Sequence, residues 1–145
     1  MTTRVALDTS ALMMPVELDV RLFDELERLL CGAPRPPESD RGSSPRDGAF
    51  EVLAPRPVVD ELRRLADGGG LEGTAASVGY ELATDRCLVV ETDESYADDA
   101  LVELAREGGA DYVVTNDRPL GDRVLDANVP VIALRGRNKL TITQP

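Results

Sequence analysis

The sequence predicts a single α/β domain, residues 1–145, with a three-layer fold. Its central, mostly parallel five-stranded sheet is covered by helices. Short β-branched or apolar runs alternate along the chain with longer amphipathic runs, which is the order of a βα fold. The short runs lack a strict polar alternation, as is typical of parallel strands buried on both faces. A chain of 145 residues with 42% apolar side chains has material for one core.

The five strands are expected where short apolar runs occur. They are residues 4–7 (RVAL), 51–54 (EVLA), 87–90 (CLVV), 112–115 (YVVT) and 131–134 (VIAL). Helices are expected where apolar residues recur at helical spacing. They are residues 18–30, 58–65, 71–82, 97–106 and 120–126. The first of these helices carries a core stripe of Val20, Leu22, Phe23, Leu26, Leu29 and Leu30.

Residues 33–49 (APRPPESDRGSSPRDGA) interrupt this alternation. The segment is rich in Pro, Ser, Gly and charged residues and has no apolar period, so it cannot bury enough surface to offset the entropy of ordering it. We expect a flexible surface insert there. Residues 67–70 (DGGG) are expected to end one helix and form a turn.

The residue inventory excludes several classes of chemistry. The chain has no His and two cysteines, Cys31 and Cys87, so a four-ligand zinc site, Cys–His or Ser–His catalysis and a disulfide framework lack their residues. No apolar run approaches the roughly 20 residues that span a bilayer, and the N-terminus has no apolar signal segment. We therefore expect a cytoplasmic protein without membrane association, whose chemistry depends on carboxylates.

The formal net charge is −11, and of the sixteen basic residues fifteen are Arg and only Lys139 is lysine. An acidic, Lys-poor surface is typical of halophilic proteins, because carboxylates hold water and net charge opposes association. At high salt the long-range field of the protein is screened within a few ångströms. The acidity therefore does not exclude a nucleic-acid partner.

Acidic residues fall at the ends of several predicted elements. Asp8 and Asp117 directly follow the first and fourth strands, where ligands bind in open α/β sheets. Asp98 and Asp99 open one helix, and Glu61 lies early in another. Each residue alone fits a capping or helix-dipole role. Together they would repel one another unless a cation compensates, and clustered carboxylates select Mg²⁺ or Mn²⁺.

The motifs VALDTSAL, PVVDEL, YADDALVELA, VVTNDRPL and VPVIALRGRNKLTI occur in this order over nearly the whole chain. In this order they resemble the PIN domain nucleases, within them the branch of archaeal PIN proteins and the eukaryotic small-subunit processome endonuclease. The most specific parts are YADD, TND followed by Arg, and the closing stretch. The resemblance implies a PIN-like three-layer fold and metal-binding catalytic acids at Asp8, Glu61, Asp99 and Asp117.

Asp98 is the alternative metal ligand beside Asp99. Consecutive helical residues diverge by about 100°, so one of the two faces a shared metal ion. We expect Asp99 to do so, since it extends the buried face, and Asp98 to accept a hydrogen bond from the first helical turn. The resemblance also implies that Thr9, Thr115 and Asn116 orient the carboxylates. Candidate phosphate-binding residues near this edge are Arg118, Arg123, Arg135, Arg137 and Lys139, for which surface ion pairs are the alternative.

The resulting prediction is an endoribonuclease that uses Mg²⁺ or Mn²⁺ to hydrolyse RNA phosphodiesters, either in rRNA processing or as a toxin-type ribonuclease. The implied partners are RNA, single-stranded or structured, a second copy of the chain, and an antitoxin or a ribosome-assembly factor. A non-catalytic RNA-binding module is one alternative, although such modules commonly lose acids that are all present here. A receiver-type phosphoacceptor domain, using Asp8, Asp93 and Thr115, is the other, but Arg135 stands where it needs lysine.

Overall fold

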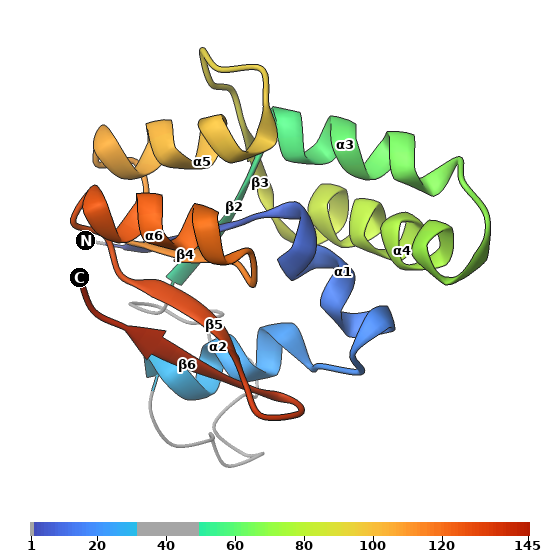
Figure 1. Cartoon of the computed structure of the whole chain (residues 1–145), viewed down its shortest axis with the longest axis horizontal. Helices are drawn as coiled ribbons and strands as arrows, with labels where there is room; N and C mark the ends of the chain where they lie inside the picture. The colour runs from blue at the N-terminus through green and yellow to red at the C-terminus, as the bar shows by residue number, and fades with distance from the viewer. Residues whose placement is uncertain (1, 32–49) are drawn as a thin grey trace, which may run out of the picture.

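The computed structural model describes residues 2–31 and 50–145, and the predicted insert at residues 33–49 lies outside them. Each of the first four strands of the described chain is followed by one or two helices, and the fifth strand is followed by a sixth (Figure 1). The strands are β1 (Thr3–Leu7), β2 (Phe50–Pro55), β3 (Leu88–Val90), β4 (Tyr112–Val114), β5 (Val131–Arg135) and β6 (Lys139–Thr143). The helices are α1 (Thr9–Glu17), α2 (Leu22–Cys31), α3 (Arg56–Ala66), α4 (Gly70–Arg86), α5 (Ala97–Arg106) and α6 (Arg118–Asp126).

The strands form one sheet in the order β3-β2-β1-β4-β5-β6, parallel except for β6. The predicted mostly parallel sheet is confirmed. The predicted number of five strands was wrong, because β6 forms a sixth strand. It turns back from β5 through Gly136, whose positive φ of 74° suits glycine, and pairs antiparallel with Leu140 opposite Leu134. Its Lys-Leu-Thr-Ile-Thr alternation is that of an edge strand with one covered face.

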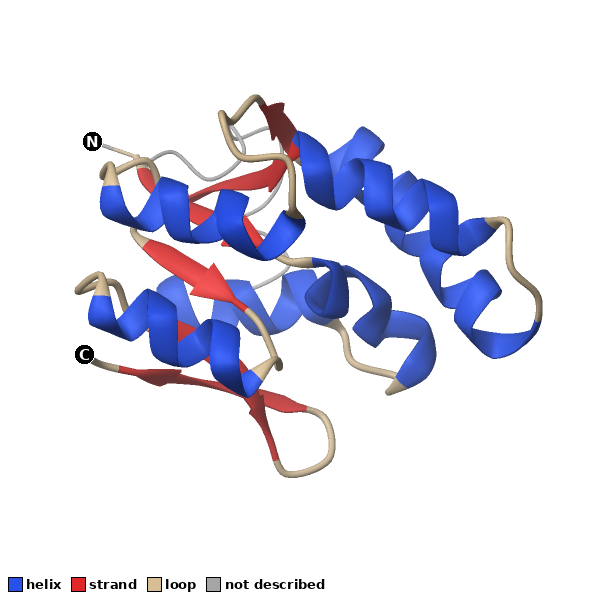
Figure 2. Cartoon of the chain, turned by 45° about the horizontal axis from the view of Figure 1, so that its top comes forward, coloured by secondary structure: helices blue, strands red, loops and turns tan. Residues whose placement is uncertain are grey.

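Helices lie on both faces of the sheet. In Figure 2, α5 and α6 stand in front of the strands and α2 stands behind them. The helices α1, α3 and α4 pack against one another, and α4 approaches α1 so closely that a Cβ at Gly79 would lie 2.8 Å from the carbonyl oxygen of Leu12. This glycine therefore sets how near the two helices come.

The first helical region differs from the prediction of one helix at residues 18–30. Two helices occur, α1 and α2, and Leu18 is the C-cap of α1. The helix α1 was not predicted, because its central residues 11–14 are all buried, which leaves no amphipathic period, and because Pro15 lies inside it. Of the predicted stripe, Val20, Leu22 and Leu26 are buried in the core.

The strand order reverses between β1 and β4, the place where open α/β sheets bind ligands. Leu7 pairs with Val114, so the residues that follow, Asp8 and Thr115, leave the sheet side by side. Both are buried. In the described part of the chain, no helix is long and apolar enough to cross a membrane.

Candidate active site

Asp8 follows β1 and caps α1, which fixes its carboxylate at the edge of the sheet. Its Oδ1 accepts a hydrogen bond from the backbone N–H of Ala11 at 2.7 Å, as expected for an N-cap aspartate. The Ser10 hydroxyl donates to the same oxygen at 2.8 Å, and the Thr115 hydroxyl donates to Oδ2. Three donors, from the residue after β4 and from the first turn of α1, therefore orient the side chain of a residue that is only 4% exposed.

The two hydroxyl groups also connect Asp8 to the segment after β4. The Asn116 N–H donates to the Ser10 hydroxyl at 3.2 Å, and the Asp117 N–H donates to the Thr115 hydroxyl at 3.0 Å. Each hydroxyl accepts from this segment and donates to the Asp8 carboxylate. The DTS and TND motifs, more than a hundred residues apart, are thus parts of one hydrogen-bonded network.

Burial raises the pKa of Asp8 to about 6, because desolvation disfavours the carboxylate. The hydrogen bonds from Thr115, Ala11 and Ser10 act in the opposite direction, and the negative charge of Asp98 adds to the increase. The fold therefore places a carboxylate where its charge is costly and a cation would be favourable.

Glu61 lies on α3 and is half-buried. The Thr9 hydroxyl at the start of α1 donates to Glu61 Oε1 at 2.5 Å. A residue adjacent to Asp8 thus orients a carboxylate from another helix, which is the supporting role predicted for Thr9. Glu61 is also one of the charges that raise the pKa of Asp98.

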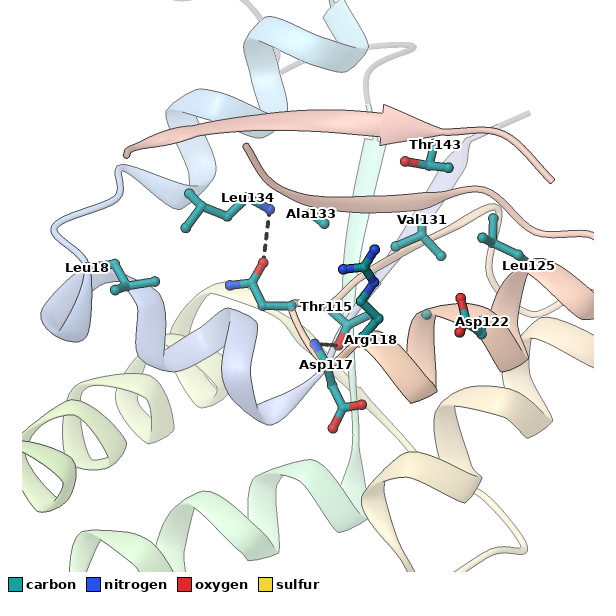
Figure 3. Close-up of a pocket in the computed structure, with 12 residues that line it drawn as sticks. Leu18, Thr115, Asp117, Arg118, Asp122, Leu125, Val131, Ala133, Leu134 and Thr143 are labelled. Carbon is teal, nitrogen blue, oxygen red and sulfur yellow. Dashed lines mark hydrogen bonds between the residues drawn. The ribbon is translucent and has the colours of Figure 1, made fainter. Parts of the chain in front are cut away.

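Asp117 is the N-cap of α6, and its Oδ1 accepts from the Leu120 N–H at 2.9 Å. The side chain is exposed, and Figure 3 shows its carboxylate pointing away from β5 and β6. Asn116 is tied instead to the sheet, since its Oδ1 accepts from the Leu134 N–H at 2.9 Å. The predicted supporting residues Thr115 and Asn116 therefore hold the loop that carries Asp117.

The two acids at the start of α5 face different neighbours. Desolvation raises the pKa of Asp98, and the charges of Asp117 and Glu61 raise it further. Asp99 instead accepts a hydrogen bond from Arg123 on α6 at 3.0 Å. Asp98 is thus the acid influenced by Asp117 and Glu61, whereas Asp99, the metal ligand expected from the sequence, is paired with Arg123. The expected cap at Asp98 is also replaced: the N-cap is Tyr96, and no side chain caps this helix.

We call Asp8, Glu61, Asp98 and Asp117 the acidic edge. Its members come from four elements, and no Arg or Lys of the described residues forms an ion pair with any of them. Within residues 2–31 and 50–145, no three Asp, Glu or Cys side chains already stand close enough to hold a metal ion. The donors still fit Mg²⁺ or Mn²⁺, because these hard ions take oxygen ligands and Mg²⁺ commonly binds one or two carboxylates and several waters.

The predicted phosphate-binding residues divide into three groups. Arg118 is exposed at the first turn of α6, beside Asp117. Arg123 is paired with Asp99. The exposed residues Arg135, Arg137 and Lys139 lie together at the β5–β6 hairpin. A surface ion pair is therefore observed for Arg123, and the hairpin supplies a local positive charge to an acidic chain.

Sequence reasoning missed Ser10, which links Asp8 to Asn116. Its signal was its position two residues after an Asp at a strand end, where a hydroxyl can reach the cap carboxylate. The receiver-type alternative does not fit, since receiver domains have strand order 2-1-3-4-5 and Asp93 here follows the edge strand β3. Asp93 donates its backbone N–H to Glu103 at 3.0 Å.

A family model described as a PIN like domain matches residues 5–35 and 46–137, which include all four members of the acidic edge. The chain belongs to the PIN-like domain family. The predicted resemblance to PIN domain nucleases is thereby confirmed. Among curated relatives of this PIN domain, Ribonuclease VapC4 of Methanocaldococcus jannaschii is 30% identical over 95 residues, which cover 64% of this chain and 72% of that protein.

Other similarities extend to more distant proteins. The UPF0178 protein of Caulobacter sp. is 37% identical over 86 residues, which cover 56% of this chain and 55% of that protein. The structure of the PIN domain endonuclease Utp24 matches with a TM-score of 0.71 and 19% identity, covering 98% of this chain and 92% of that one. A domain of a functionally unknown protein from Methanocaldococcus jannaschii matches with a TM-score of 0.60 and 15% identity, covering 95% of both chains. The structural matches show the PIN fold.

Proposed function

We propose that this PIN domain is a divalent-metal-dependent endoribonuclease that hydrolyses RNA phosphodiester bonds. The observation that carries the proposal is the acidic edge at the reversal of strand order, with Asp8 buried in its centre. Carboxylates that face the same edge of the sheet repel one another without a cation, as the raised pKa values of Asp8 and Asp98 indicate, and a purely structural site need not have this stability cost. The 30% identity to a protein named as a ribonuclease supports RNA as the substrate.

When bound, a Mg²⁺ or Mn²⁺ ion supplies an activated water and neutralises charge that develops on the phosphate. Asp8 would bind the ion from a fixed position, because Ala11, Ser10 and Thr115 hold its carboxylate. Asp117 would bind it from the adjacent loop, whose backbone N–H groups hydrogen-bond to the same two hydroxyls.

The two remaining acids come from helices on the other side of this network. Thr9 orients Glu61, which we assign to a second ion or to the attacking water. The charges of Asp117 and Glu61 add to the raised pKa of Asp98, which supports our assignment of Asp98 as the ligand from α5 in preference to Asp99. The Arg135, Arg137 and Lys139 side chains would contact phosphates along the RNA.

The experiment is RNA cleavage by the purified protein at high salt. The parent should cut single-stranded RNA with Mn²⁺ or Mg²⁺ and stop on addition of EDTA. Asp8→Asn should remain folded by circular dichroism and lose more than about a hundredfold in activity, since even residues that only orient metal ligands cost roughly 10–100-fold. Asp85→Asn, an exposed site on α4, is the matched control and should cleave like the parent. Equal cleavage by the Asp8 variant would indicate a contaminating nuclease.

We propose two kinds of partner in addition to RNA: a second copy of the chain, and either an antitoxin or a ribosome-assembly factor. Sedimentation of the purified protein tests the second copy. Growth arrest on expression of the parent, absent with Asp8→Asn, would support the toxin-type role. Co-sedimentation with precursor ribosomal particles and no growth arrest would support the role in rRNA processing. A non-catalytic RNA-binding module would bind RNA but would not cut it in the cleavage assay.

A further inference from the structure

A pocket of about 570 Å³ lies beside the acidic edge, between α6 and the strands β5 and β6 (Figure 3). We call it the α6–β5 pocket. Its apolar lining includes Leu125 from α6 and Val131, Ala133 and Leu134 from β5. Leu18, which is 43% exposed at the end of α1, lies at one end. The pocket therefore offers an apolar surface that is open to solvent and is not filled by the described residues.

The pocket shares a wall with the proposed catalytic site. Thr115, Asn116 and Asp117 all line it, and the first two hold the network around Asp8. Figure 3 shows the Asp117 carboxylate pointing away from β5 and β6, while the guanidinium of the next residue, Arg118, extends toward these strands. Consecutive residues at the start of α6 thus face the acidic edge and the pocket. A nucleotide whose phosphate is at Asp117 has the pocket within reach of its base.

The polar side chains of the pocket supply both hydrogen-bond donors and acceptors. Asn116 uses its Oδ1 to accept from the Leu134 N–H, which leaves its amide N–H groups as the free part of the side chain. Arg118 forms no ion pair with any residue in the described ranges. Asp122, one turn along α6, adds an acceptor. An apolar surface with a few directional polar groups is typical of small-molecule sites.

We propose that the α6–β5 pocket is a nucleobase subsite that receives the base next to the scissile phosphate and favours guanine. This inference rests on the proposed ribonuclease function. Guanine presents two adjacent acceptors, O6 and N7, that match the guanidinium of Arg118, and its N1 and N2 donors suit Asp122. Adenine presents an N6 donor in place of O6, which would face the donors of Arg118 and Asn116.

Base-dependent RNA binding tests the subsite. The probes are fluorescein-labelled single-stranded uridine hexanucleotides with one central guanosine or one central adenosine. They are titrated at fixed salt into Asp8→Asn protein, which prevents cleavage, and binding is measured by fluorescence anisotropy. The guanosine probe should bind about tenfold more tightly, within the 1–3 kcal/mol of a bidentate base contact.

Two variants in this background separate base recognition from charge and fold. Arg118→Ala should abolish the preference for guanosine. Arg106→Ala removes the same charge at the far end of α5 and should keep the preference. Ala133→Phe, which fills the pocket without removing a charge, should reduce the affinity for the guanosine probe more than the affinity for the adenosine probe.

Three outcomes would overturn the subsite. The two probes bind equally, neither probe binds, or Arg118→Ala and Arg106→Ala reduce the affinity for both probes by the same factor. Cleavage by the parent protein is scored separately. Base-dependent binding without cleavage by the parent would support the subsite and contradict the proposed nuclease function. Cleavage without base preference would support the nuclease function and contradict the subsite.

Discussion

At the end of β1, Asp8 is buried and receives hydrogen bonds from Ala11, Ser10 and Thr115, whereas at the start of α5 Asp98 is exposed and the helix has no side-chain cap. Tyr96, the N-cap of α5, is 74% exposed. The first region is fixed before any ligand arrives. The second is open to solvent. Both carry raised pKa values, and burial is the largest cause at each; hydrogen bonds oppose the increase at Asp8, whereas the charges of Asp117 and Glu61 add to it at Asp98.

The largest expected effect concerns the buried charge of Asp8. Its folded-state pKa of about 6 lies above the ordinary value of 3.8, so the folded state binds the proton more tightly. Stability should therefore fall as pH rises through the window from 3.8 to 6, by up to about 3 kcal/mol, since one pKa unit is about 1.4 kcal/mol. Urea unfolding in EDTA at several pH values should show this loss in the parent.

Asp8→Asn is the reference for that measurement, because it retains every other carboxylate. The difference in unfolding free energy between parent and variant should shift in favour of the variant as pH rises. A difference that stays constant with pH would mean that Asp8 titrates normally and is not desolvated.

The next largest effect is expected for the Thr115 hydroxyl, which connects the Asp8 carboxylate to the Asp117 N–H. Thr115→Val keeps the shape of the side chain but leaves Asp8 without one donor and the Asp117 N–H without its acceptor. We expect a loss of about 2 kcal/mol in stability and roughly 10–100-fold in cleavage. Thr115→Ser restores the hydroxyl and should recover most of both. Failure of serine to rescue would show that packing of the methyl group, and not the hydroxyl, accounts for the loss.

The smallest effect is expected at the exposed region, where the two adjacent acids are compared. Asp98→Asn should weaken Mn²⁺ binding about tenfold, whereas Asp99→Asn should have little effect on metal binding, since Asp99 is paired with Arg123. Calorimetric titration with Mn²⁺ measures both. If Asp99→Asn shows the larger loss, the order chosen from the sequence is correct and α5 rotates or unwinds when the site is occupied.

The order of strands and helices was largely predictable, because buried parallel strands leave apolar runs in the sequence. The helix α1 was not, since its buried centre hides the amphipathic period, and β6 was overlooked because edge strands carry a weaker apolar signal. At the site, the sequence placed Asp8 and Asp117 at strand ends. It did not predict the link from Ser10 to Asn116, which depends on pairing between β1 and β4. The orientations of Asp98 and Asp99 depend on how α5 rotates when it packs against α6, which no local pattern encodes.

The central claim is that the acidic edge binds a divalent cation through Asp8. Calorimetric titration of Mn²⁺ into parent, Asp8→Asn and Asp85→Asn proteins at constant high salt tests it most directly. We predict saturable binding to the parent and to Asp85→Asn, and loss of that binding in Asp8→Asn, with all three proteins folded. Equal Mn²⁺ binding by the parent and Asp8→Asn, or no saturable binding to the parent, would contradict the claim.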